Sequence, residues 1–293
     1  MHCRCVRIVA LLAGSLATTG CIGAEIEEDV EDEVDTSGST VLTTNGYLAN
    51  ALSPNALSPN ALSPNALSPN ALSPSALSPG AVAALKNPGE SGDLARQLLR
   101  YIVGCALRPD QTFSFSWIEG RGLIHREVYR GELGLAPWWA ADGLEDGHHQ
   151  RLITACIASR ANWYGVSVMV SLRNGETPLG SQDVERAIFP VREGAFWGNL
   201  FGATPYARAC YAPQGVEHAR KAQRDCAAGH VAVDPATGAA TVQPCGPILI
   251  AGSCDELCTR VDMNGGYYSH CLDDPWSSPW VRTDVVITSY LTR

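Results

Sequence analysis

Apolar and polar positions alternate regularly only in the C-terminal two thirds of the chain, so we expect the folded domain at residues 92–293. Apolar residues of the segment 94–103 recur at helical spacing, behind Ser91 or Asp93 as a capping residue. A second apolar stripe at helical spacing runs from Leu152 to Ala161. The pattern therefore predicts two amphipathic helices that pack together.

Alternation with a period of two predicts the strands. Residues 112–117 and 123–133 flank a Gly-Arg-Gly turn and predict a β-hairpin. Further strands are predicted at residues 166–172, 187–191, 195–201 and 281–291. The first of these is the most apolar and is expected at the centre of the sheet. Residues 206–275 are rich in glycine, proline and cysteine, which predicts a loop insertion. The predicted fold is one disulfide-rich α+β domain with a mixed or antiparallel sheet.

Residues 45–80 repeat the pentad Asn-Ala-Leu-Ser-Pro. Each proline removes a backbone donor, fixes φ and biases the preceding serine toward extended geometry. We therefore interpret the repeat as a disordered, polyproline-like stalk. A solenoid of pentapeptide repeats is the alternative, but the run is short and has no capping turn. The sequence does not assign a role to the leucine in each pentad; docking along the domain or a partner is one explanation.

Residues 1–20 have the pattern of an export signal, with basic residues, a short apolar run and small residues before Cys21. The end of this segment resembles the lipobox of bacterial lipoproteins, although Thr18 stands where leucine is usual. The resemblance implies lipidation of Cys21 and a membrane anchor. Ile22 is not the aspartate that retains lipoproteins at the inner membrane, which favours the outer membrane. Ordinary secretion with a free Cys21 remains the alternative.

Charge is concentrated in front of the repeat. The chain carries a net charge of −9, and eight acidic residues lie between Glu25 and Asp35. We expect residues 21–44 to form a solvated, disordered acidic tail, with capture of a divalent ion or a basic partner as the alternative. The remaining charges nearly balance, so the domain has no basic footprint for nucleic acid.

Cysteine content indicates the redox environment. Three of the eleven cysteines lie in the leader or end it, and eight lie in the domain. These eight are Cys105, Cys156, Cys210, Cys226, Cys245, Cys254, Cys258 and Cys271. An even number on an exported chain predicts four disulfides. Cys105 and Cys156 lie on the apolar faces of the two predicted helices, so they are the first pair expected. The last four cysteines lack paired C-x₂-C spacing, and no metal or cofactor is predicted.

Aromatic residues and carboxylates give the candidate binding set. Its members lie in or beside predicted loops: Trp138, Trp139, Tyr267, Tyr268, Asp273, Asp274, Trp276 and Trp280. Planar rings beside carboxylates are typical of sugar recognition, because ring faces stack and oxygens bind hydroxyls. The alternative is that these rings fill the core of a loop-rich fold.

A hydrolase is the competing hypothesis. His148 and His149 adjoin acidic residues at a helix start, and either of them with Asp273 or Asp274 would supply acid–base groups. The chain contains no G-x-S-x-G elbow, phosphate-binding loop or H-E-x-x-H motif.

Three stretches, together with the lipobox, acidic tail and pentad repeat, carry a resemblance. They are Leu135 to Trp138, Ala155 to Asn162 and Glu193 to Asn199. With these features the chain resembles a group of predicted myxobacterial lipoproteins to which no activity is assigned. The resemblance implies an exported, disulfide-bonded protein at the cell envelope. We therefore expect an outer-membrane lipoprotein that presents its domain for binding or surface structure, with a polysaccharide or an envelope protein as partner. Hydrolysis of an envelope or extracellular polymer is the alternative.

Overall fold

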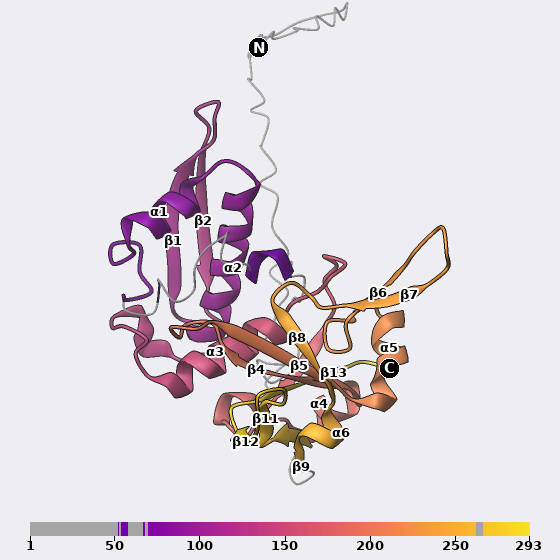
Figure 1. Ribbon diagram of the computed structural model, residues 1–293. Coiled ribbons are helices and arrows are strands. Elements are labelled where there is room, and N and C mark those ends of the chain that lie inside the picture. Colours follow the sequence, from indigo (N-terminus) through magenta and orange to yellow (C-terminus); the bar gives the residue numbers. More distant parts are fainter. Residues whose placement is uncertain (1–51, 53, 58–66, 68–69, 262–265) are drawn as a thin grey trace, which may run out of the picture. The chain divides into compact units, whose positions relative to one another are not determined.

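The computed structural model describes Leu52, residues 54–57, Leu67, residues 70–261 and residues 266–293 (Figure 1). The expected signal segment 1–20, the acidic tail 21–44 and Cys21 lie outside the described residues. Among the helices that are described, none combines the length and the apolar character needed to cross a membrane.

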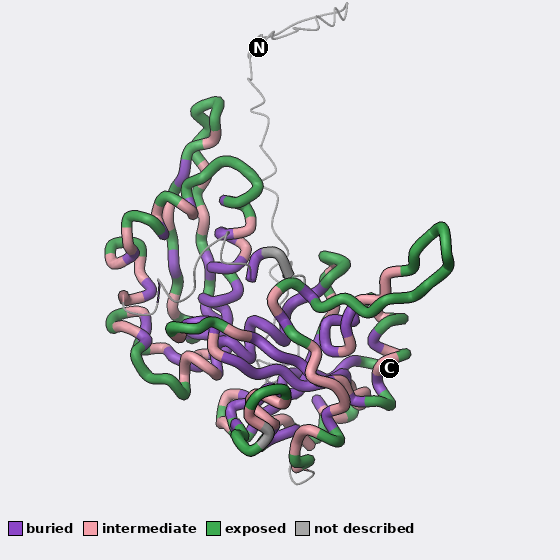
Figure 2. Tube along the Cα trace, viewed as in Figure 1, coloured by how far each residue is buried: buried purple, intermediate pink, exposed green. Residues whose placement is uncertain are grey.

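A five-stranded sheet in the order β3-β13-β4-β5-β8 forms the centre of the fold. Its strands are β3 (Val170–Arg173), β13 (Ile287–Leu291), β4 (Val191–Asn199), β5 (Tyr206–Tyr211) and β8 (Ile248–Ser253). Neighbouring strands are antiparallel except β5 and β8, which run parallel. Most residues of β4, β5 and β13 are buried (Figure 2). The mixed sheet and the α+β class agree with the prediction.

Helix α3 (Gly147–Ser159) covers one face of this sheet, whereas α2 (Glu90–Ala106) packs on α3 and α1 (Pro79–Lys86) packs on α2. Helix α3 contacts β4, β5 and β13. The disulfide between Cys105 and Cys156 joins α2 to α3, which confirms the first pair expected. Helix α2 begins after Gly89 rather than after Ser91 or Asp93, and Asp93 pairs with Arg96 in its first turns.

The predicted hairpin is also present. Strand β1 (Thr112–Ile118) pairs antiparallel with β2 (Ile124–Arg130). Both α1 and α2 contact this hairpin.

Short strands cover the opposite face of the central sheet (Figure 1). Strand β9 (Thr259–Val261) pairs with β10 (Tyr267–Ser269), and β11 (Cys271–Asp274) pairs with β12 (Ser278–Thr283). Side chains of β4 alternate between two cores, since Phe196 faces the helices whereas Ala195 and Trp197 face the short strands. A separate hairpin of β6 (His230–Val233) and β7 (Ala240–Gln243) is largely exposed.

Three further disulfides stabilise the second half of the domain. They join Cys210 to Cys254, Cys226 to Cys245 and Cys258 to Cys271. The first ties β5 to helix α6 (Cys254–Leu257). All eight domain cysteines are therefore paired, as predicted for an exported chain.

The described part of the pentad repeat differs from the expected stalk. Its leucines are Leu52, Leu57, Leu67, Leu72 and Leu77, all at most 9% exposed and all in the main core. Leu52 also exchanges backbone hydrogen bonds with Arg160 and Asn162, at 3.3 and 2.8 Å. For these residues the expectation of a disordered stalk is wrong, and the alternative explanation of the repeated leucine, docking along the domain, holds. Each leucine buries apolar surface that stabilises this docking.

The expected loop insertion at 206–275 is likewise wrong, because this stretch contributes β5 and β8 to the central sheet. Residues 187–191 end helix α4 (Asp183–Ile188) instead of forming a strand, and β4 runs without a break through 192–194. A charged residue inside β4 obscured the pattern: Glu193 is buried and paired with Arg224 at 2.9 Å. Strand β3, expected in the centre, lies at the sheet edge.

Candidate functional site

A cavity of about 360 Å³ lies at the start of β5, on the face covered by the short strands. Its lining consists of Thr204, Tyr206, Arg208, Asp273, Asp274, Ser278 and Val281. Strand β5 supplies Tyr206 and Arg208, whereas the end of β11 supplies the two aspartates. The cavity therefore joins residues that are about seventy positions apart in the chain.

Tyr206 and Asp273 are hydrogen-bonded to each other in the lining of this cavity. The tyrosine hydroxyl donates to Asp273 Oδ1 at 2.8 Å and lies 3.0 Å from Oδ2. Burial, together with the hydrogen bond and the charge of Asp273, raises the pKa of Tyr206 to about 12. Tyr206 is therefore a neutral hydrogen-bond donor at physiological pH.

Arg208 links the two aspartates. It donates to the backbone carbonyl of Asp273, and its Nη2 lies 3.2 Å from Asp274 Oδ2. The guanidinium also lies over the ring of Tyr206, 4.5 Å from its centroid. This arrangement fixes a buried cation beside the Asp274 carboxylate in the cavity lining.

Asp274 caps the turn between β11 and β12. Its carboxylate accepts hydrogen bonds from the Ser277 hydroxyl and from the backbone N–H groups of Trp276 and Ser277. These donors, the Ser277 hydroxyl first, and the charge of Arg208 lower the pKa of Asp274, which is ionised at neutral pH. A general acid would need the opposite shift, so Asp274 suits binding rather than proton donation.

Trp276 is not a lining residue of the cavity but lies next to two of them, Asp274 and Arg208. Its side chain is 56% exposed, and its ring centroid lies 5.6 Å from the guanidinium carbon of Arg208. An exposed indole beside fixed polar groups offers an apolar face for stacking and hydrogen-bond partners for hydroxyls. Of the predicted binding set, the structure brings together Asp273, Asp274 and Trp276.

The remaining aromatic residues of that set lie elsewhere. Trp139 and Tyr268 are fully buried, so for these two the alternative of core packing holds. Trp138 is 41% exposed and packs edge-on against His149. Tyr267 is partly buried beside Gly175. Trp280 is 89% exposed on β12 but does not line the cavity.

Sequence reasoning missed Tyr206 and Arg208, because both fall in the stretch expected to be a loop. A short alternating pattern could have indicated a strand here. Tyr206, Arg208 and Cys210 alternate with two alanines, as in a strand with small residues on one face.

Histidines do not join this cavity. His148 Nε2 lies 3.2 Å from Glu176, and His149 pairs with Asp146. Another pair escaped sequence reasoning: His230 Nδ1 lies 2.8 Å from the buried Asp225, and its ring stacks on Trp163. No histidine occurs among the lining residues of the cavity.

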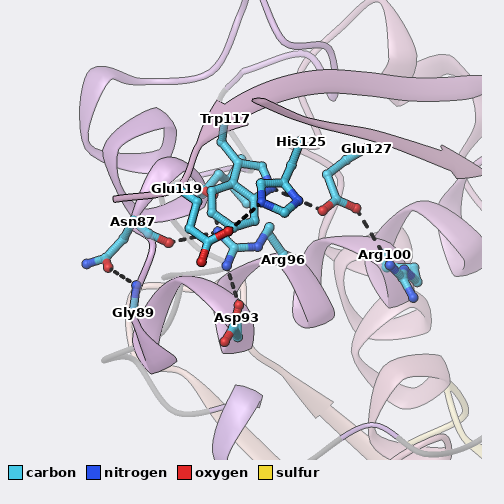
Figure 3. A network of polar contacts seen from close by, with 10 residues as sticks. Asn87, Gly89, Asp93, Arg96, Arg100, Trp117, Glu119, His125 and Glu127 are labelled. Atoms are coloured by element: carbon cyan, nitrogen blue, oxygen red, sulfur yellow. Dashed lines mark hydrogen bonds and ion pairs between the residues drawn. The ribbon is translucent and has the colours of Figure 1, made fainter. Parts of the chain in front are cut away.

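A second polar region lies between α2 and the β1–β2 hairpin (Figure 3). Arg96 donates to the carbonyls of Leu85 and Asn87 at 2.7 and 2.8 Å, and its guanidinium lies 3.8 Å above the Trp117 ring. The ring of His125 also stacks on Trp117, at 4.2 Å. Trp117 is buried, and its indole N–H lies 3.1 Å from Glu127 Oε1 of the hairpin.

The charges of this region neutralise one another. A cavity of about 500 Å³ is lined by three arginines, Arg96, Arg100 and Arg160, and by three carboxylates, Asp93, Glu127 and Glu132. Arg160 lies 2.7 Å from Glu132, and Arg100 lies 3.7 Å from Glu127. We interpret this network as the connection that holds the hairpin to α2.

Two groups of residues have the proximity of metal ligands. They are Cys210, Cys258 and Cys271, and Asp225, Cys226 and Cys245. Every sulfur in both groups belongs to a disulfide, so these cysteines do not offer thiolates to a metal.

Comparison with known proteins adds no assignment. No family model, curated protein or solved structure matches the chain.

Proposed function

We propose that this protein is an exported, lipid-anchored binding protein. Its domain recognises a neutral polysaccharide at the cavity at the start of β5, next to Trp276. Cys21 carries the anchor, and the outer membrane is the location. The resemblance to predicted lipoproteins supports the anchor, and the four disulfides fit a domain that folds outside the cytoplasm.

One observation carries the binding proposal. The Trp276 ring is exposed beside Asp274 and Arg208, whose positions are fixed by hydrogen bonds and an ion pair. A pyranose ring has apolar C–H faces and a rim of hydroxyls. The indole would take one face, while the carboxylates accept from hydroxyls and the guanidinium donates to ring or hydroxyl oxygens.

The size of the cavity supports a ligand of one or two sugar units. A volume of about 360 Å³ lies in the range of small-molecule sites, roughly 300–1,000 Å³. The exposed Trp276 ring beside the lining residues extends the surface that a ligand can contact, so we favour a segment of a polysaccharide over a free monosaccharide.

Fluorescence titration with cell-wall and exopolysaccharide oligomers tests the proposal. Wild-type protein should show saturable changes in tryptophan emission, and Trp276→Ala should weaken binding roughly tenfold or more. Asp274→Asn should weaken it as well. Trp138→Ala is the matched control, since Trp138 is an exposed indole outside the cavity. Equal binding by wild type and Trp276→Ala would reject this site.

The anchor has its own test. Mass spectrometry of the mature N-terminal peptide from the native cell should find Cys21 as the first residue, with acyl chains attached. A free Cys21 on a soluble chain would reject the anchor but leave the binding proposal standing.

Hydrolysis receives no comparable support. Glycoside hydrolysis needs a carboxylic acid with a raised pKa as general acid, whereas the hydrogen bond from the Ser277 hydroxyl and neighbouring donors lower the pKa of Asp274. A polysaccharide that is bound but not shortened on prolonged incubation is the expected outcome.

A further inference from the structure

The β1–β2 hairpin ends in an exposed apolar surface. Its turn extends beyond α1 and α2, and most residues around the turn are exposed (Figure 1; Figure 2). Ile118, Leu123 and Ile124 lie at this end, and each of these side chains is more than half exposed. Ile118 is paired with Ile124 across the two strands, so both lie on the same face. Large apolar side chains that gather on a surface are typical of a contact with a protein or a membrane.

The two faces of the hairpin differ in their surroundings. Phe113, Trp117 and Tyr129 are buried on the inner face, against which α1 and α2 pack. The outer face carries the alternate residues, among them Val128, which is also more than half exposed. Among the described strands, β1 and β2 pair only with each other. The outer face is therefore accessible to a partner along the hairpin.

Three arginines accompany the apolar residues. Arg126 and Arg130 alternate with apolar residues on the outer face of β2, and Arg121 lies in the turn. All three are exposed, and none of them has a hydrogen bond or an ion pair with another residue that the structure describes. These guanidinium groups are therefore available to an anionic partner.

The two carboxylates of the hairpin are engaged elsewhere. Glu119 lies 3.1 Å from Nε2 of His125, and Glu127 lies 3.7 Å from Arg100 of α2. Both glutamates alternate with the exposed residues and are only partly exposed. The accessible charge of the outer face is thus positive, and it lies beside apolar side chains.

The backbone of the turn suits a less polar environment than water. The Glu119 N–H donates to the carbonyl of Leu123 at 2.9 Å, and the Gly122 N–H donates to the carbonyl of Glu119 at 2.8 Å. The strand pairing continues up to Ile118 and Ile124. Unpaired backbone groups are costly in an apolar phase, so these internal hydrogen bonds lower the cost of shallow entry into a bilayer.

We infer that this hairpin binds the surface of an anionic bilayer. The apolar side chains at its end enter the boundary between headgroups and acyl chains, and the three arginines pair with lipid phosphates. The cations favour a bilayer rich in anionic lipid over a neutral one. This contact would act in addition to the proposed anchor on Cys21 and does not depend on it.

Vesicle sedimentation tests the inference. The mature chain carries Cys21→Ser, so that no acyl chain contributes to binding. It should bind vesicles that contain phosphatidylglycerol, bind vesicles of phosphatidylcholine alone roughly tenfold more weakly, and lose affinity as sodium chloride is added. Leu123→Ser combined with Ile124→Ser, and Arg121→Gln combined with Arg126→Gln, should each weaken binding to the anionic vesicles roughly tenfold or more.

Two matched variants serve as controls. Val233→Ser changes an exposed valine of the β6–β7 hairpin, which contains no lysine or arginine. Arg282→Gln removes an exposed arginine of β12. Both should bind the vesicles as the parent chain does.

The altered side chains are exposed, so the variants should keep the four disulfides and the circular dichroism spectrum of the parent chain. Absence of binding to the anionic vesicles, or equal binding by the parent chain and both double variants, would overturn the inference. A dimer, or a complex with an acidic protein, that forms through this face without any vesicle binding would overturn it as well. Oligosaccharide binding and acylation of Cys21 are measured separately, so failure here is distinguishable from failure of the proposed function.

Discussion

The indole N–H of Trp139 donates a hydrogen bond to the backbone carbonyl of Asn70, over 2.9 Å and 69 positions of sequence. In return, the backbone N–H of Leu72 donates to the carbonyl of Trp139 at 2.6 Å. The last part of the pentad repeat is thus bonded to the 3₁₀ turn Pro137–Ala140, and its leucines complete the core beneath. The prolines help this docking, because they restrict the unfolded repeat and reduce the entropy lost on ordering.

Truncating a repeat leucine should therefore destabilise the domain. Leu72 is buried, and Leu72→Ala should lower the free energy of unfolding by roughly 2–5 kcal/mol. Chemical denaturation followed by tryptophan fluorescence measures the change. Ser75→Ala, at an exposed position in the next pentad, should stay within about 0.5 kcal/mol of wild type. If both variants unfold like wild type, the repeat does not pack on the domain.

The pairing of the eight cysteines is a second prediction. Peptide mapping under non-reducing conditions should recover Cys105–Cys156, Cys210–Cys254, Cys226–Cys245 and Cys258–Cys271. Cys210 and Cys258 are the cysteines most easily mispaired, because their sulfurs lie 3.7 Å apart although they are bonded to Cys254 and Cys271. Recovery of a Cys210–Cys258 peptide from freshly isolated protein would contradict the arrangement of β5, α6 and β11.

Much of the fold follows from local pattern. The hairpin of residues 112–130 and the helices that carry Cys105 and Cys156 have clear periodicity, and the structure confirms them. The central sheet was harder to predict, because its order joins strands that are far apart in sequence. Glu193 inside β4 indicated a turn, and only its contact with Arg224 explains how a carboxylate is buried there.

The candidate site was predicted in part. Asp273, Asp274 and Trp276 are neighbours in sequence, so their common location could be expected. Tyr206 and Arg208 meet them only through the packing of β11 against β5, which no local pattern encodes. Trp139 was predicted as a binding residue because its sequence context indicated a loop. It is buried instead, and its indole N–H contacts the distant repeat, which local sequence does not reveal.

The buried ion pair in β4 gives a third prediction. Arg224 donates to Glu193 at 3.0 and 2.9 Å and to the carbonyl of Ser159 at 2.8 Å, and both side chains are buried. Arg224→Met leaves the Glu193 charge uncompensated and should lower the free energy of unfolding by roughly 3–5 kcal/mol.

Two further variants test whether the uncompensated charge of Glu193 causes this loss of stability. Adding Glu193→Gln to Arg224→Met should recover part of the loss, because the buried charge is removed. Lys221→Met breaks the exposed pair with Glu217 and should change stability by at most about 1 kcal/mol. Thermal and chemical denaturation measure all three, and similar losses for Arg224→Met and Lys221→Met would contradict the account.

Tyrosine ionisation gives a fourth prediction. Tyr206 has a folded-state pKa of about 12, whereas a tyrosine in the unfolded chain has a pKa of about 10. A raised folded-state pKa means that the protonated form stabilises the fold. The contribution is fully present below about pH 10 and is lost as the pH rises toward the folded-state pKa.

Absorbance of tyrosinate as a function of pH measures this effect. Tyr206→Phe should remove one late-ionising tyrosine and reduce the loss of stability above about pH 10. Asp273→Asn removes the negative charge that helps to raise the pKa, so Tyr206 should ionise at lower pH. A late phase that is the same in wild type and Tyr206→Phe would show that the phenol is not held by Asp273.

The most direct test of the binding site follows the indole N–H signals of the seven tryptophans by nuclear magnetic resonance while a neutral oligosaccharide is added. Trp276→Phe assigns the signal of Trp276. We predict that this signal shifts saturably, whereas the signals of Trp138 and the buried Trp139 stay in place. A Trp276 signal that does not move at the highest soluble concentration of any oligomer that binds the protein would contradict the proposed site.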